Sequence, residues 1–128
     1  MIIFAFHLRN LMTELIETIV EAIADKKGRD IVAIDLSAID GAAAEAFVVC
    51  SADSPAQVEA IVRNVEEQAI ERLGEKPRRV EGMINATWVV MDYYDVMVHV
   101  FHTETRAFYK LDALWADAPT TRYEEGNS

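Results

Sequence analysis

Residues Ala86 to Phe101 have the sequence ATWVVMDYYDVMVHVF, which predicts a β-hairpin. Two runs rich in valine and bulky side chains, 86–91 and 96–101, have the composition of neighbouring antiparallel strands. The residues between them include Tyr93 and Tyr94. A two-residue turn at these positions requires positive φ, which tyrosine rarely adopts, so the turn type stays open.

The predicted hairpin has two chemically different faces. If Asp92 pairs with Asp95, Trp88 lies opposite His99, and residues two apart share a face. The aliphatic face suits packing under helices and carries Val89, Met91, Val96, Val98 and Val100. The other face carries Trp88, Met97, His99 and Phe101. Aromatic residues and Met are enriched at the centres of protein interfaces, so this face either completes the core or meets a partner.

The chain before the hairpin predicts a helix and two strands. Apolar residues recur every three or four positions from Leu8 to Ile23, which is typical of an amphipathic helix, and Gly28 after two lysines predicts a left-handed cap. Residues 30–36 are rich in Ile and Val and predict a strand, followed by a loop at 37–44. Residues 47–51 predict a second strand, apolar on both faces and therefore central.

A capping box marks the start of the second long helix. Ser54 precedes a proline, and Gln57 stands three residues after the serine, where its side chain can reach back to the cap. Gly74 and Pro77 close this helix. Residues 78–81 then predict a short edge strand.

The C-terminal part predicts one short helix and a tail. The helix starts near Tyr109, has Leu111, Leu114 and Trp115 at helical spacing, and ends at Pro119. Residues 120–128 are polar and predict a frayed end. The whole order predicts a single small α/β (α+β) domain with a roughly five-stranded sheet, two main helices and a short C-terminal helix.

Composition restricts the class of function. The chain has 128 residues, one cysteine and a formal net charge of −10. This charge disfavours direct nucleic-acid binding, which needs clustered Lys and Arg, and favours a basic partner. No apolar stretch reaches the length of a membrane span, and the first positive charges follow the apolar opening, unlike a secretory signal. We therefore expect a cytoplasmic protein without membrane association, with Met12 as a candidate alternative start.

Candidate catalytic and metal groups are few. The chain has no glycine-rich phosphate loop, and Cys50 lies in an apolar strand where a thiol is usually inert. His99 and His102 are three apart on a predicted strand, so they point to opposite faces and do not chelate one ion. Asp92 and Asp95, with Glu81, offer a magnesium site, although turns favour aspartate anyway. We predict no enzyme, no cofactor and no metal.

The sequence resembles the ribosome silencing factors, also called Iojap-like proteins. The likeness runs from about Thr13 to Ala118. It is carried by Glu81-Gly82, Trp88 to Asp92, Asp95, Val98 to Phe101, Arg106, Tyr109, Leu111 and Leu114-Trp115, with matches at 27–36 and 47–54. Where the family often has glycine in the hairpin turn, this chain has Tyr94.

The resemblance implies a fold, a partner and a set of motif positions. The fold implied is a small α/β domain with a mixed sheet, which is distantly similar to nucleotidyltransferases but lacks their catalytic residues. The partner implied is ribosomal protein fourteen of the large ribosomal subunit. Binding of the silencing factor to this protein would block joining of the small subunit and so repress translation under nutrient limitation. The implied domains are an N-terminal extension (1–12), the silencing-factor domain (13–118) and a polar tail (119–128), with a possible homodimer.

Three hypotheses follow. The first is a translational repressor whose partner-binding residues are the motif positions Trp88, Asp95, His99, Arg106, Tyr109 and Trp115. The second is a divergent nucleotidyltransferase that uses Glu81, Asp92 and Asp95 with magnesium. The third is a plain homodimerisation module in which the aromatic face joins two copies.

Overall fold

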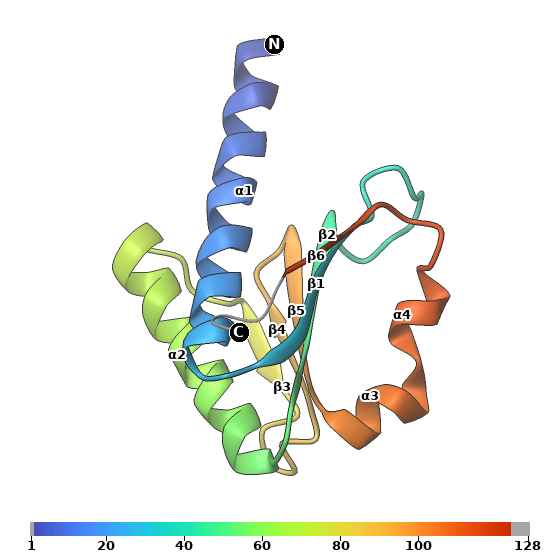
Figure 1. The fold of residues 1–128 in the computed structure, drawn as a ribbon. Coiled ribbons are helices and arrows are strands. Elements are labelled where there is room, and N and C mark those ends of the chain that lie inside the picture. Colours follow the sequence, from blue (N-terminus) through green and yellow to red (C-terminus); the bar gives the residue numbers. More distant parts are fainter. Residues whose placement is uncertain (1, 124–128) are drawn as a thin grey trace.

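A six-stranded mixed sheet forms the centre of the molecule, in the order β3-β4-β5-β2-β1-β6 (Figure 1). The computed structural model describes residues 2–123, and the side chains of residues 10–123. The strands are β1 (Arg29–Asp35), β2 (Ala46–Ala52), β3 (Arg79–Glu81), β4 (Trp88–Asp92), β5 (Val96–His102) and β6 (Thr120–Arg122). β2 and β5 are parallel, and the other neighbours are antiparallel. Every residue of β2 is buried, which confirms it as a central strand.

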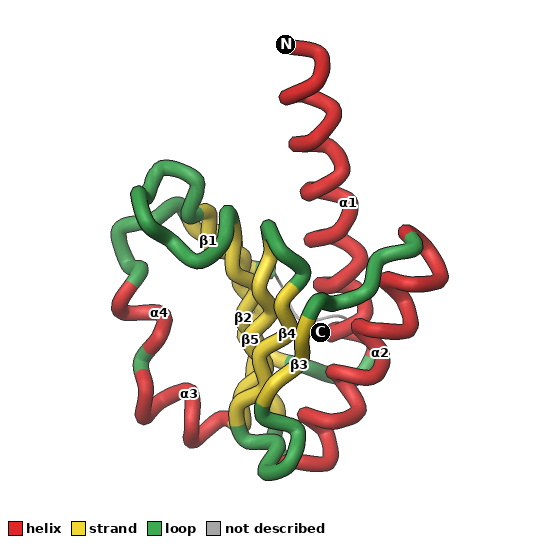
Figure 2. The backbone as a smooth tube through the Cα atoms, turned by 180° about the vertical axis from the view of Figure 1, so that it is seen from behind, coloured by secondary structure: helices red, strands yellow, loops and turns green. Residues whose placement is uncertain are grey.

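Helices cover both faces of this sheet (Figures 1 and 2). The long helices α1 (Ile2–Asp25) and α2 (Pro55–Leu73) lie on one face, and the short helices α3 (Thr103–Tyr109) and α4 (Leu111–Leu114) lie on the other. No helix in the described residues has both the length and the apolar character needed to cross a membrane.

The two layers have different cores. The core under α1 and α2 is mostly aliphatic and contains all five predicted hairpin residues of the aliphatic face. The core under α3 and α4 is richer in aromatic residues and contains Phe47 and Phe101, with Trp88, Met97, Leu111 and Trp115 packed against it. The predicted single mixed domain is therefore confirmed, with six strands where roughly five were expected.

The predicted register of the hairpin was wrong by two residues. Trp88 pairs with Phe101, and Val90 pairs with His99. Because strand side chains alternate with a period of two, this shift leaves every side chain on its predicted face. The turn needs positive φ at Tyr94 only, where φ is 74°, and the Asp92 carboxylate accepts a hydrogen bond from the Tyr94 amide at 2.8 Å.

Two C-terminal predictions were also wrong. Helix α3 starts directly after β5 and buries none of its residues, so it has no apolar periodicity by which the sequence could reveal it. Residues 120–122 form β6 on the edge of β1 rather than a frayed end, and the rest of the tail, 124–128, lies outside the described residues. Backbone pairing with β1 creates β6, and composition does not encode that pairing.

The helix caps are close to the prediction. The Ser54 hydroxyl accepts from the Gln57 amide at 3.1 Å, and Gly74 closes α2 with φ of 67°. The Gln57 side chain accepts from the Asp53 amide, one residue before the expected one. At the end of α1 the left-handed residue is Lys27 rather than Gly28. Position 28 requires glycine for steric reasons, because a Cβ atom there would lie 2.3 Å from the Cγ2 atom of Ile23.

Candidate functional site

Large apolar side chains are exposed on α3 and α4. Phe108 is 78% exposed, Tyr109 52% and Leu114 71%, and we call these three residues the α3–α4 surface. Phe108 and Tyr109 meet edge to face, with ring centroids 5.1 Å apart. Adjacent residues of a helix do not share a face, so two neighbouring aromatic rings at the end of a seven-residue helix cannot both enter one core. Exposed apolar groups gathered in this way mark a protein-interaction site.

Trp88 supports the α3–α4 surface from the sheet. Its ring lies 4.9 Å from the Tyr109 ring and stacks on Phe101 at the same distance. The indole N–H donates to Nδ1 of His99 at 3.1 Å, which fixes the orientation of both rings. Trp88 is half-buried, so it forms the floor of the surface.

His99 lies inside the aromatic core. It is 5% exposed and contacts Phe47, with ring centroids 4.5 Å apart. Burial lowers the pKa of His99 to about 4, because the charged imidazolium is poorly solvated there. The imidazole is therefore neutral at physiological pH and acts as the hydrogen-bond acceptor for Trp88.

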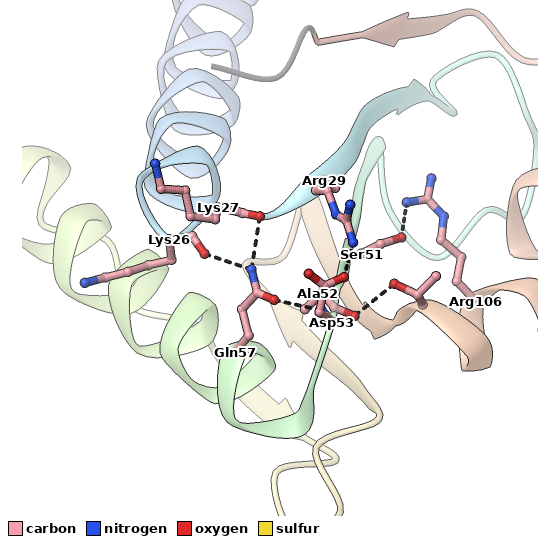
Figure 3. A network of polar contacts seen from close by, with 9 residues as sticks. Lys26, Lys27, Arg29, Ser51, Ala52, Asp53, Gln57 and Arg106 are labelled. Atoms are coloured by element: carbon pink, nitrogen blue, oxygen red, sulfur yellow. Dashed lines mark hydrogen bonds and ion pairs between the residues drawn. The ribbon is translucent and has the colours of Figure 1, made fainter. Parts of the chain in front are cut away.

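Arg106 joins four elements. Its Nε and Nη2 atoms bind the two carboxylate oxygens of Asp112 at 3.1 and 2.8 Å. Its Nη1 atom donates to the Asp30 carbonyl and to the Ser51 hydroxyl, both at 2.8 Å. Figure 3 shows the contact with Ser51. The side chain is only 12% exposed. The hydrogen bond from Arg106 holds the pKa of the Asp112 carboxyl below its usual value, so the pair stays ionised.

The structure brings five of the six predicted partner-binding residues to this side of the sheet. Trp88, His99, Arg106 and Tyr109 have been placed above, and Trp115 is half-buried edge-on against Phe47, with centroids 6.0 Å apart. Asp95 lies elsewhere: it precedes β5, whereas α3 follows β5, so the full strand separates them.

Two exposed residues of the surface were missing from the prediction. Phe108 was not singled out, and Leu114 was named only for its helical spacing and as a motif residue, because no apolar periodicity indicates α3 or shows that α4 turns Leu114 outward. The adjacent aromatic residues 108 and 109 were the available signal.

The predicted catalytic alternatives have ordinary structural roles. Asp92 is buried, which alone would raise its pKa, but hydrogen bonds from the Arg78 guanidinium at 2.6 Å and from the Tyr94 amide outweigh this and lower it. Glu81 pairs with Arg79 at 3.6 Å. Burial raises the pKa of Cys50 to about 12, so its thiol is protonated and unreactive. Among the described residues, no three His, Cys, Asp or Glu side chains gather as a metal site would require.

The sequence matches a known family over nearly its whole length. The model described as "Ribosomal silencing factor during starvation" (RsfS) matches residues 10–128. The chain belongs to the ribosomal silencing factor family. This membership confirms the resemblance given by the hairpin and C-terminal motifs.

Individual relatives of the silencing factor family agree with this assignment. Ribosomal silencing factor RsfS of Halalkalibacterium halodurans is 41% identical over 111 residues, which cover 87% of this chain and 93% of the relative. RsfS of Bacillus subtilis is also 41% identical, over 102 residues, 80% of this chain and 85% of the relative. A crystal structure of a protein from Bacillus halodurans has a TM-score of 0.74 at 38% identity and covers 87% of this chain and 99% of that one. The two relatives are named silencing factors, not enzymes, which agrees with the predicted non-enzyme.

Proposed function

We propose that this chain represses translation by docking on the large ribosomal subunit. Membership of the ribosomal silencing factor family supports a ribosome-associated silencing role. The observation that carries the docking proposal is the α3–α4 surface, where three large apolar side chains are exposed and the Tyr109 ring rests on Trp88. The proposed partner is ribosomal protein fourteen, contacted as a protein and not through direct nucleic-acid binding.

Silencing is steric in this proposal. The bound protein occupies surface that the small subunit needs under nutrient limitation, so no reaction, cofactor or metal is required. The formal charge of −10 favours encounter with a basic ribosomal protein in the cytoplasm, and the buried aromatic contacts hold the complex afterwards.

Five of the six motif residues take different roles in this proposal. Tyr109 contacts the partner directly, together with Phe108 and Leu114. Trp88, His99 and Trp115 support that contact from below because they are buried or half-buried. Asp95 is exposed at the far end of β5 and is proposed as a separate contact at the rim.

Single alanine substitutions at the α3–α4 surface test the proposal. We expect Phe108→Ala and Tyr109→Ala each to weaken binding to purified large subunits by about 2 kcal/mol, roughly 30-fold, as at other interface hot spots. Binding is measured by co-sedimentation over a concentration series. Ile70→Ala is the matched control, since this isoleucine is also exposed but belongs to α2 on the other layer.

Two results would contradict the docking proposal. Undiminished binding of both aromatic variants would exclude the α3–α4 surface as the contact. Failure of the parent protein to bind large subunits would exclude docking altogether. If both aromatic substitutions instead convert a dimer into a monomer without affecting ribosome binding, the homodimerisation hypothesis accounts for the surface.

A further inference from the structure

We propose that Arg106 is a positioning residue, which fixes α3 and α4 in the orientation that presents Phe108, Tyr109 and Leu114 as one preformed docking surface. The inference rests on the proposed docking function and adds a residue that acts without touching the partner. It changes the role of Arg106 from an expected contact to an internal brace.

The ion pair of Arg106 spans the bend between the two short helices. Arg106 belongs to α3 and Asp112 to α4, and between the helices Lys110 adopts a left-handed conformation with φ of 54°. Phe108 and Tyr109 precede this bend and Leu114 follows it. The two parallel hydrogen bonds between guanidinium and carboxylate therefore constrain the angle at which the exposed residues stand to one another.

The remaining guanidinium nitrogen attaches this unit to the sheet. Nη1 donates to the Asp30 carbonyl of β1 and to the Ser51 hydroxyl of β2, the second of which is drawn in Figure 3. One side chain thus links α3, α4 and two strands. Thr103 adds one more contact at the start of α3, where its hydroxyl donates to the Ala52 carbonyl at 3.0 Å.

Polar attachment matters here because α3 has little apolar attachment. None of the residues of α3 or α4 is fully buried, and a seven-residue helix is unstable by itself. Apart from the Tyr109 ring against Trp88, the apolar packing of this segment comes from Leu111 and Trp115, both beyond the bend. Arg106 consequently provides the main polar attachment of the helix that carries Phe108 and Tyr109.

Only arginine makes this set of contacts. The planar guanidinium offers five N–H donors in a fixed fork, whereas lysine has a single nitrogen and cannot make the paired carboxylate contact. The side chain is also too enclosed to contribute much area to a partner. Arg106→Lys therefore keeps the positive charge and removes the paired hydrogen bonds with the carboxylate.

Amide hydrogen exchange of the free protein tests the positioning role directly. We expect Arg106→Lys and Asp112→Asn to accelerate exchange in residues 103–115 by about tenfold or more, and to leave α2 and β5 within about twofold of the parent. Arg72→Lys is the matched control, because Arg72 also pairs with a carboxylate, that of Glu21, at 2.7 Å on the other layer. Unchanged exchange in residues 103–115 of both variants would overturn the proposal.

A double-mutant cycle on ribosome binding tests whether Arg106 acts through the surface. Arg106→Lys should weaken large-subunit binding about tenfold in the parent and less than about threefold in a Tyr109→Ala background, because the surface that it positions is already lost. Equal losses in both backgrounds would show an independent contact and overturn the positioning role. If the parent does not bind large subunits, the proposed function fails, and the exchange experiment still decides whether Arg106 braces α3 and α4.

Discussion

At the scale of single residues, His99 makes stability depend on pH. The imidazole is buried and neutral, and its pKa of about 4 in the folded protein lies below the ordinary value near 6.5. Protonation would also turn Nδ1 into a donor facing the donor N–H of Trp88, so their hydrogen bond would be lost. Between these two pKa values the imidazole is therefore protonated in the unfolded chain but neutral in the folded state.

The sign of this dependence follows from proton uptake. Above pH 6.5 neither state carries the proton, so His99 contributes no slope. Between pH 6.5 and about 4 the unfolded chain binds it first, so the free energy of unfolding falls as pH falls, by a total on the order of 3 kcal/mol. Urea denaturation across this range measures the slope.

Two histidine variants separate this effect from that of the carboxylates. We expect His99→Gln to remove most of the slope between pH 6.5 and 4.5, since the amide does not titrate there. His102→Gln, three residues along the same chain segment, should keep it. If the free energy of unfolding of His99→Gln falls with pH as steeply as that of the parent, other groups cause the acid sensitivity.

At the scale of elements, Gln57 connects the start of α2 to the end of α1 (Figure 3). Its amide nitrogen donates to the carbonyls of Lys26 and Lys27, each at 3.0 Å, while its oxygen accepts from the Asp53 amide. The last carbonyls of a helix lack partners within that helix, so this single side chain satisfies groups from two helix ends.

Removing this link should destabilise the whole domain. We expect Gln57→Ala to lower the free energy of unfolding by about 2 kcal/mol, because three hydrogen bonds are lost at partly exposed positions. Gln68→Ala, at another half-buried glutamine of α2, should cost less than about 0.5 kcal/mol, as usual for positions without such a role. Chemical denaturation compares the two, and equal losses would refute the special role of Gln57.

At the scale of the whole molecule, charge and apolar surface are separated. From residue 10 onward, α1 carries Glu14, Glu17, Glu21 and Asp25 and has no Lys or Arg. On the other layer, Arg106 and Asp112 neutralise each other beside the α3–α4 surface. In the proposed docking, long-range attraction to a basic partner would come from the net charge of the molecule, and short-range attachment would come from the α3–α4 surface.

This separation predicts how salt affects docking. Raising sodium chloride from about 50 to 300 mM shortens the screening length from about 14 to about 6 Å, so the association rate with large subunits should fall several-fold. The dissociation rate should change less than about twofold, because apolar contacts hold the complex. Surface-immobilised subunits and an optical biosensor measure both rates. A salt effect confined to dissociation would show that ion pairs, not aromatic contacts, hold the complex.

Patterns local in the chain determined much of this fold. Alternation with a period of two correctly predicted both faces of the hairpin. The predicted register was wrong by two residues, and a shift of two residues leaves each side chain on the same face. The capping signals at Ser54 and Gly74 correctly predicted the ends of α2, since a cap is made by residues next to the helix. The motif around Trp88 and His99 was sufficient to indicate the family.

Tertiary structure decided which of these residues are accessible. The family resemblance placed Trp88, His99, Arg106 and Tyr109 in one motif, but only the packing of α3 and α4 buries His99, encloses Arg106 and exposes Phe108 and Leu114. Burial depends on contacts between segments far apart in the chain: Arg106 reaches Asp30 and Ser51, and β6 exists because β1 offers an edge. Such contacts leave no periodic trace in the sequence.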